Sequence, residues 1–194
     1  MARPRQVSDD EILEAARECF LTHGPGVSTT VIAEQLGVSQ AALFKRFHTK
    51  QDLLIAALSP PAEPAWLPLV HPGPDDRPLR DQLVEIASAM HRFFLGVTPC
   101  IATLQASGID MRALMSRYDV PPPIRAQRAL TAWFARAVDR GIAHTADPAA
   151  VASMLIGALH GRHFMAQVGG VTGDDEAYVD AVVTTLCDGL EVTP

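Results

Sequence analysis

Residues 28–50 of the chain read STTVIAEQLGVSQAALFKRFHTK, and this stretch decides the fold. The pattern predicts one helix that begins at Ser28 or Thr29 and runs to about Leu36, and a second over about residues 40–46 that Ser39 can cap. Gly37 lies directly after the first helix, where a residue with positive φ commonly ends a helix and turns the chain. Two short helices joined across such a turn are typical of a helix-turn-helix.

The apolar and polar residues of this stretch separate onto two sides. Apolar side chains are expected to form the small core that fixes the crossing of the two helices, namely Ile32, Leu36, Val38, Leu43 and Phe47. Small and polar residues at the start of the second helix then face outward, namely Ser39, Gln40, Ala41 and Lys45. The first residues of such a helix can enter the major groove of DNA and contact base edges.

The charge of the whole chain and the charge of this stretch point in different directions. With 16 basic and 22 acidic residues the net charge is −6, which argues against a protein that binds nucleic acid over its whole surface. The only lysines, however, are Lys45 and Lys50, and residues 40–50 contain no acid. We therefore expect a local basic patch that binds one phosphate backbone.

Helical patterns continue on both sides of this stretch, and no strand longer than a few residues is predicted. Ser8 and Glu11 have the spacing of a capping box, at the start of a helix that Gly24 ends. Caps, apolar periodicity and glycine or proline breaks predict the remaining helices over about residues 50–58, 79–97, 99–106, 109–118, 122–140, 148–168 and 174–190. In the helix predicted over about residues 122–140, the polar face is lined by Arg125, Arg128, Arg136 and Arg140. The predicted fold class is all-α.

A segment with seven prolines in twenty residues, 59–78, is the one clear boundary in the chain. Prolines at this density indicate either a stiff linker or an ordered cover segment. The segment separates a helix-turn-helix domain, residues 1–58, from a second helical domain, residues 79–194.

A series of short motifs runs without gaps through residues 12–54. They are Ile12-Leu13, Ala15-Ala16, Phe20, His23-Gly24, Thr29-Thr30, Ile32-Ala33, Leu36-Gly37-Val38-Ser39, Leu43-Phe44, Phe47, Thr49-Lys50 and Leu53-Leu54. Together they resemble the DNA-binding domain of TetR-family transcriptional regulators. The resemblance implies a repressor that binds a palindromic operator in double-stranded DNA as a homodimer and is released by a small molecule. It also implies that residues 79–194 form a ligand-binding and dimerisation domain.

The same resemblance suggests which residues contact DNA. Thr29, Thr30 and Lys50 would bind phosphate, and the second helix of the motif would supply base-edge contacts. The candidate DNA-binding residues are Arg3, Arg5, Thr29, Thr30, Ser39, Gln40, Ala41, Phe44, Lys45, His48 and Lys50. The arginines of this set would form a basic arm before the first helix. The chain departs from the family at Phe44, where relatives often carry tyrosine, so a hydroxyl that could bind phosphate is absent.

The second domain carries two further sets of candidate residues. The glycines of the first set let two helix backbones approach closely, and its last members form an apolar stripe. This candidate dimer interface consists of Gly157, His160, Gly161, Phe164, Tyr178, Val182 and Leu186. Soft and aromatic residues that could line an apolar ligand pocket are Met90, Phe93, Phe94, Met111, Met115, Trp133, Phe134 and Met154, with His91, Arg92, Arg112 and Arg117 as polar anchors.

Other kinds of site are not indicated. No nucleophile motif, phosphate loop or carboxylate pair points to an enzyme, and no cofactor is expected. His160 and His163 share one helix but lack a third ligand nearby in sequence, so no metal site is expected. Three scattered cysteines indicate no disulfide, and the absence of a signal peptide or a long apolar run predicts a cytoplasmic protein outside the membrane. The alternative function is a helix-turn-helix regulator that acts through a protein partner without a small-molecule effector.

Overall fold

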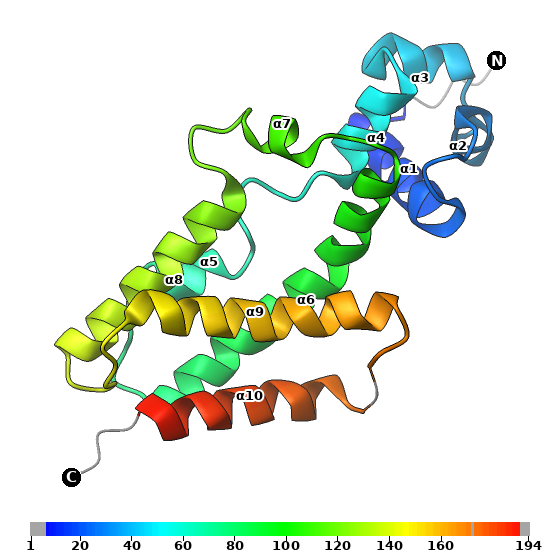
Figure 1. Ribbon diagram of the computed structural model, residues 1–194. Coiled ribbons are helices and arrows are strands. Elements are labelled where there is room, and N and C mark those ends of the chain that lie inside the picture. Colours follow the sequence, from blue (N-terminus) through cyan, green and yellow to red (C-terminus); the bar gives the residue numbers. More distant parts are fainter. Residues whose placement is uncertain (1–6, 172, 191–194) are drawn as a thin grey trace. The chain divides into compact units, whose positions relative to one another are not determined.

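The computed structural model describes residues 7–171 and 173–190, and all regular secondary structure within these ranges is helical (Figure 1). In chain order the helices are α1 (Asp9–His23), α2 (Thr29–Leu36), α3 (Gln40–Phe47), α4 (Lys50–Leu58), α5 (Leu67–Val70), α6 (Leu79–Ala106), α7 (Met111–Met115), α8 (Pro122–Asp139), α9 (Pro148–Gln167) and α10 (Asp175–Leu190). The predicted all-α fold class is confirmed. The short helix α5, inside the proline-rich segment, was not predicted.

The predicted helix caps form the hydrogen bonds expected of them. Ser8 and Glu11 make the reciprocal bonds of a capping box at the start of α1. Ser28 and Ser39 each accept a hydrogen bond from a backbone N–H of the helix that follows. Gly37 ends α2 in the left-handed conformation, with φ at 65°. Because residues with a Cβ rarely adopt this conformation, the turn between α2 and α3 depends on glycine.

The chain divides into two compact units. The first unit consists of Met1–Pro60 and Pro99–Leu114, and the second of Pro61–Thr98 and Met115–Pro194. This differs from the predicted division, which placed all residues from 79 onward in one domain. The thiol of Cys100 is 1% exposed and hydrogen bonds with Arg17 of α1, which shows how the last turns of α6 join the first unit.

Helix α6 continues through Pro99, where the sequence predicted a break between two helices. Proline has no N–H, so it cannot donate to the carbonyl of Leu95 one turn earlier. Leu95 is 57% exposed, which lets water take the place of that donor. The hydroxyl of Thr103 donates to the carbonyl of Pro99 at 2.9 Å. The prediction of two helices was wrong because a long helix can continue through a proline where the residue whose carbonyl loses its donor is exposed.

The proline-rich segment is an ordered cover of the second unit. Trp66, Leu67 and Val70 of this segment are at most 1% exposed and belong to the main apolar core. The core also contains Met90 of α6 and Trp133 of α8, both equally buried. Part of the proline-rich segment thus packs into the core of the second unit.

Two arginines of α8 hold the backbone of this cover segment. Arg136 donates from Nη2 to the carbonyls of Val70 and His71, at 2.9 and 3.3 Å. Arg140 donates to the carbonyl of Pro74 and to the carboxylate of Asp76. Charge-assisted bonds to backbone carbonyls fix the path of a segment that has little regular structure of its own.

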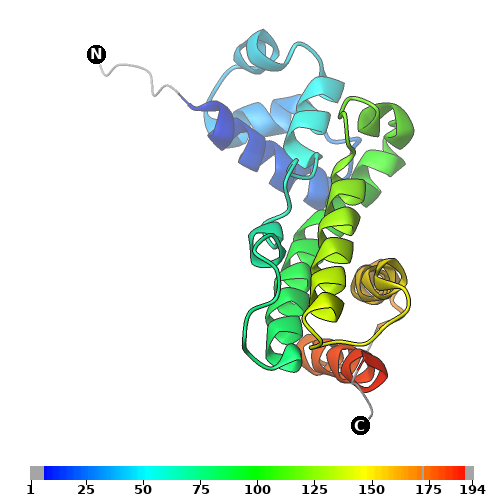
Figure 2. The same cartoon turned by 90° about the vertical axis from the view of Figure 1, so that its left-hand side faces the viewer.

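In the second unit α9 contacts both α8 and α10, and α9 and α10 run antiparallel to each other (Figures 1 and 2). Buried residues of α10 pack towards α9 and α8: Val179, Val183, Leu186, Cys187 and Leu190. Among the helices described, none combines the length and the apolar character needed to cross a bilayer.

Candidate nucleic-acid interface

Helices α2 and α3 form the predicted helix-turn-helix. Ile32, Ala33 and Leu43 are at most 3% exposed and form the centre of the contact between the two helices. The remaining predicted core residues, Leu36, Val38 and Phe47, are half-buried. On the opposite side the N-terminal turn of α3 is open, since Ser39, Gln40 and Ala41 are all exposed. The sequence correctly separated the inner from the outer face of this motif.

Thr29 and Gln40 join the two helices of the motif through their side chains. The amide Nε2 of Gln40 donates to Oγ1 of Thr29 at 2.6 Å. Thr29 is 4% exposed, so its hydroxyl lies between the helices, whereas the neighbouring Thr30 is exposed. Of the two threonines expected to contact phosphate, Thr30 presents its side chain to solvent and Thr29 supports the motif from within.

The predicted basic patch contains residues with different roles. Lys45 and His48 are exposed, and Lys50 is half-buried at the first position of α4. Arg46, in contrast, donates from Nη1 to the backbone carbonyl of Val7 at 2.6 Å and pairs with the carboxylate of Asp9 at 2.9 Å. Arg46 is also an exposed residue, but its guanidinium is engaged in these two contacts, which join the end of α3 to the start of α1.

Phe44 lies at the edge of the motif and not in its centre. It is half-buried, while the adjacent Leu43 is completely buried. A para-hydroxyl on Phe44 is therefore compatible with solvent access. The arginines of the predicted basic arm, Arg3 and Arg5, lie outside the described residues.

The structure brings five of the eight candidate ligand-pocket residues together in one core and places the other three elsewhere. Met90, Trp133 and Phe134 are at most 1% exposed in the core of the second unit, and Phe93 and Phe94 pack around them. The three other methionines are dispersed: Met111 belongs to the first unit, Met115 is a half-buried residue of the second unit, and Met154 is 61% exposed on α9. Of the candidate polar anchors, Arg92, Arg112 and Arg117 are exposed, and His91 is buried.

The buried His91 belongs to a polar cluster that sequence reasoning did not recognise. Its Nδ1 lies 3.2 Å from Nε2 of His163, and its Nε2 lies 3.5 Å from the carboxylate of Asp175. Arg162 donates to the same carboxylate at 2.6 Å and holds the pKa of Asp175 below its usual value. Burial, and secondarily the neighbouring His91, lowers the pKa of His163. The cluster links α6, α9 and α10.

The side chains of this cluster are not placed as the ligands of a metal ion. Within residues 7–171 and 173–190, no three His, Cys, Asp or Glu side chains are grouped so that they could hold a metal ion. His160 does not face His163 but lies against the ring of Phe94, at 5.2 Å between ring centroids.

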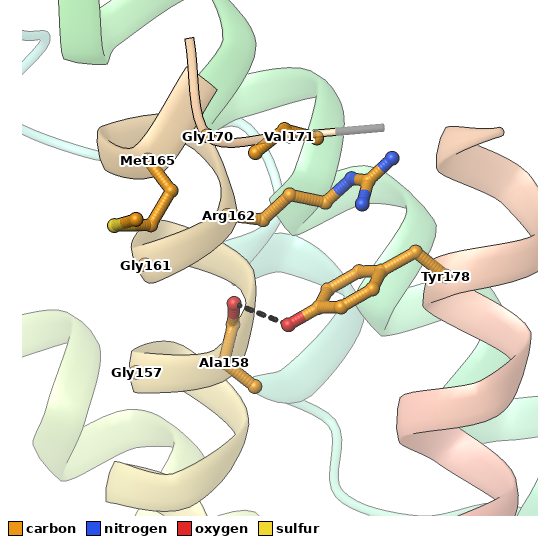
Figure 3. A pocket seen from close by; sticks show the side chains of 8 residues that line it. All are labelled: Gly157, Ala158, Gly161, Arg162, Met165, Gly170, Val171 and Tyr178. Carbon is orange, nitrogen blue, oxygen red and sulfur yellow. Dashed lines mark hydrogen bonds between the residues drawn. The ribbon is translucent and has the colours of Figure 1, made fainter. Parts of the chain in front are cut away.

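The candidate dimer interface includes an open groove between α9 and α10. The groove has a volume of about 420 Å³ and is lined by Gly157, Ala158, Gly161, Arg162, Met165, Gly170, Val171 and Tyr178. Figure 3 shows Tyr178 reaching across the groove, where its hydroxyl donates to the carbonyl of Ala158 at 3.0 Å. The Arg162 guanidinium lies 4.5 Å from the centre of the Tyr178 ring. A Cβ added at Gly157 or Gly161 would meet no atom within 4 Å.

The other predicted interface residues are placed differently. Phe164 is 56% exposed on α9, near Met154, Met165 and Val168, which are 45–67% exposed. Leu186, in contrast, is 8% exposed because it belongs to the core of its own unit. His160, Tyr178 and Val182 are half-buried within the protomer. The apolar surface therefore follows α9 more than the stripe on α10 that the sequence indicated.

Residues 12–57 match the sequence profile of the family described as bacterial regulatory proteins, tetR family. The HTH-type transcriptional repressor BdcR of Escherichia coli K12 is 27% identical to this chain over 108 residues, which cover 55% of the chain and 55% of BdcR. The chain thus matches about half the length of this curated relative. Both descriptions are of regulators, as the sequence predicted, and not of enzymes.

Solved structures extend the comparison to almost the whole chain. A protein of Mesorhizobium loti MAFF303099, assigned to the TetR family, has a TM-score of 0.72 at 21% identity and covers 95% of this chain and 96% of its own. PfmR, a TetR-family regulator of Thermus thermophilus, has a TM-score of 0.66 at 22% identity, over 94% of this chain and 100% of its own. At these identities the matches establish the fold. Residues 12–57 thus carry the sequence profile of the tetR family, and nearly the full length of the chain has the fold of these TetR-family structures.

Proposed function

We propose that the protein is a cytoplasmic transcriptional repressor that binds a palindromic operator as a homodimer and leaves it when a small apolar or amphipathic molecule binds. The observation that carries the proposal is the outer surface of α3. Its first turn is exposed, it is held on its inner side by α2, and Lys45 extends it with a positive charge. Because residues 40–50 contain no acid, this surface can approach a phosphate backbone without local repulsion.

The apolar surface of α9 supports the homodimer. Met154, Phe164 and Met165 of α9, and Val168 directly after its end, are all at least 45% exposed. Gly157 and Gly161 lie in the same helix with open space above their Cα atoms. Large exposed apolar side chains beside small residues favour close packing against a second helix surface, and a second copy of the chain supplies one.

The core of the second unit supports an effector of mixed character. It is rich in aromatic and sulfur-containing side chains, which suit an apolar molecule. Within the described residues the indole Nε1 of Trp66 is buried without a hydrogen-bond partner. A buried donor of this kind favours a ligand that brings an acceptor to it.

The proposal is tested by mixing the purified protein with sheared genomic DNA of its source and sequencing the fragments that it retains. We expect one or a few enriched sites, each with an inverted repeat whose half-sites are centred a whole number of helical turns apart, at about 34 Å per turn. A variant with both Lys45→Ala and Lys50→Ala is the control that should retain far less DNA. Failure to enrich any fragment would contradict DNA binding, and an asymmetric site without a repeat would contradict the two-fold dimer.

The effector part of the proposal needs a separate measurement on the enriched operator. A library of apolar and amphipathic small molecules is added to the protein–operator complex, and release of labelled DNA is recorded. Release by one chemical class, reversed when that compound is removed, is the expected result. If no compound releases the operator but a protein from the same cell does, the regulator acts through a protein partner instead.

A further inference from the structure

We propose that Arg46 is a positioning residue for DNA binding: it clamps the start of α1 to the end of the recognition helix α3 and does not act through contact with phosphate. The inference rests on the proposed function and refines it. A basic side chain in an acid-free patch on a DNA-binding motif would ordinarily be assigned to phosphate. The hydrogen bonds of Arg46 indicate the other role.

The clamp joins two elements that are far apart in sequence. Nη1 of Arg46 donates to the carbonyl of Val7 at 2.6 Å and to Oδ1 of Asp9 at 2.9 Å. Val7, which leads into α1, is 7% exposed, and the side chain of Arg46 is 32% exposed. One donor group shared between a backbone carbonyl and a carboxylate holds the first turn of α1 in a fixed place beside α3.

Asp9 makes the two possible roles of Arg46 distinguishable, because they predict opposite effects of removing its charge. If only the net charge near DNA matters, removing the acidic Asp9 reduces repulsion and tightens binding. If the clamp matters, removing Asp9 breaks half of it and weakens binding, as removal of Arg46 does. Asp10 carries the same charge at the next position and is also exposed, so Asp10→Ala provides a matched control.

The experiment measures dissociation constants of the full-length wild type and of Arg46→Ala, Asp9→Ala, Asp10→Ala and Lys45→Ala. The probes are the enriched operator duplex and a random duplex, each over a series of salt concentrations. We expect Arg46→Ala and Asp9→Ala both to weaken binding by roughly two- to tenfold, the range that the net value of one hydrogen bond covers. Asp10→Ala should leave binding unchanged or slightly tighter. Lys45→Ala should flatten the salt dependence by about 0.9 per lost phosphate contact, and Arg46→Ala should leave it unchanged.

The proposal is overturned if Asp9→Ala tightens DNA binding as much as Asp10→Ala does and Arg46→Ala flattens the salt dependence. Arg46→Lys adds a check, since it keeps the charge but loses the planar fork; wild-type affinity in this variant would also count against the clamp. Circular dichroism establishes that each variant is folded, and if Arg46→Ala is not, the comparison of Asp9→Ala with Asp10→Ala decides alone. A wild type that binds neither duplex contradicts the proposed function itself, which is a separate result.

Discussion

Gln40 and Thr29 form a side-chain bridge across the helix-turn-helix, with the amide Nε2 of Gln40 only 2.6 Å from Oγ1 of Thr29. Gln40 is the first residue of α3 and is predicted to contact a base edge, whereas Thr29 is the buried first residue of α2. The residue expected to read sequence is therefore also one that stabilises the motif. Replacing Gln40 is therefore expected to change both DNA recognition and stability, and each has to be measured separately.

Substitution of Gln40 by alanine should lower stability as well as alter sequence preference. The change leaves the buried Thr29 hydroxyl without its partner, which costs about 1–3 kcal/mol. Chemical unfolding followed by circular dichroism measures this cost. Thr29→Val removes the hydroxyl itself, so the double variant Gln40→Ala/Thr29→Val should be less destabilised than the sum of the single variants. Strict additivity would show that the bridge contributes nothing.

Substitution of Phe44 by tyrosine should tighten binding to any DNA duplex. Phe44 is half-buried at the edge of the motif, so the new hydroxyl can reach solvent and a phosphate. A net hydrogen bond contributes about 0.5–1.5 kcal/mol, and a dimer gains two of them. Because phosphate carries no base identity, operator and random duplexes should gain equally in fluorescence anisotropy. Unchanged or weaker binding by a folded variant would show that Phe44 does not face the backbone.

Substitution of Lys50 by alanine should weaken binding without changing its sequence preference. Lys50 begins α4 and is the second of the chain's only lysines. Loss of one phosphate contact per subunit reduces the slope of log K against log salt by about 0.9 for each contact. DNA-binding titrations at several salt concentrations provide the slope. An unaltered slope would show that Lys50 does not contact phosphate.

Substitution of Gly157 by leucine should impair dimerisation and leave the protomer folded. A Cβ at this position meets no atom within 4 Å, so the protomer leaves room for the start of a side chain there, which a partner packed on α9 would not. Overpacking at a contact costs roughly 1–3 kcal/mol per site. Gly189→Leu is the matched control, since Gly189 also has open space but lies on α10. Sedimentation at several concentrations should show a weaker dimer for Gly157→Leu alone, and equal behaviour of both variants would move the interface away from α9.

Stability should fall in mildly acidic solution because of His163. Burial lowers its pKa from an ordinary value of 6.5, so the unfolded chain takes up a proton at a higher pH than the folded protein. The free energy of unfolding therefore decreases as the pH falls from above 6.5 through the lowered pKa. His91, Arg162 and Asp175 surround this group from three helices; the carboxylate of Asp175 favours the charged form of His163, and the charge of Arg162 opposes it.

The measurement for His163 is urea unfolding at a series of pH values for the wild type and for His163→Gln. The variant should lose the part of the pH dependence between pH 7 and the lowered pKa, as expected for a single buried histidine. His144, which is exposed, provides His144→Gln as the control. Identical profiles for wild type and His163→Gln would assign the pH dependence to other groups.

The helix-turn-helix could be predicted because its signals are local. Ser28, Gly37 and Ser39 act within three residues of their own position, and the apolar residues between them repeat at the helical period. The same logic located the beginning and end of most other helices. The prediction of a helix end at Pro99 was wrong, because a proline does not always end a helix. The carbonyl that loses its donor belongs to Leu95, one turn earlier, and Leu95 is exposed.

The contacts that sequence reasoning missed connect residues far apart in the chain. Arg46 and Val7 are separated by 39 residues, Arg136 and Val70 by 66, and His163 and His91 by 72. The sequence assigned the arginines of α8 to a polar face, yet two of them fasten the cover segment. The periodic pattern of a helix does not reveal such a pairing. A long charged side chain takes the same polar position in the pattern whether its end lies in water or against a carbonyl.

The burial of both tryptophans in one unit gives the protein a built-in optical reporter. Trp66 and Trp133 are the only tryptophans of the chain, and both lie in the core of the second unit. Intrinsic tryptophan fluorescence will therefore report unfolding of the cover segment and the C-terminal core, and it will not report unfolding of the helix-turn-helix. Comparing fluorescence with circular dichroism, which follows every helix, would reveal whether the two units melt together or in separate steps.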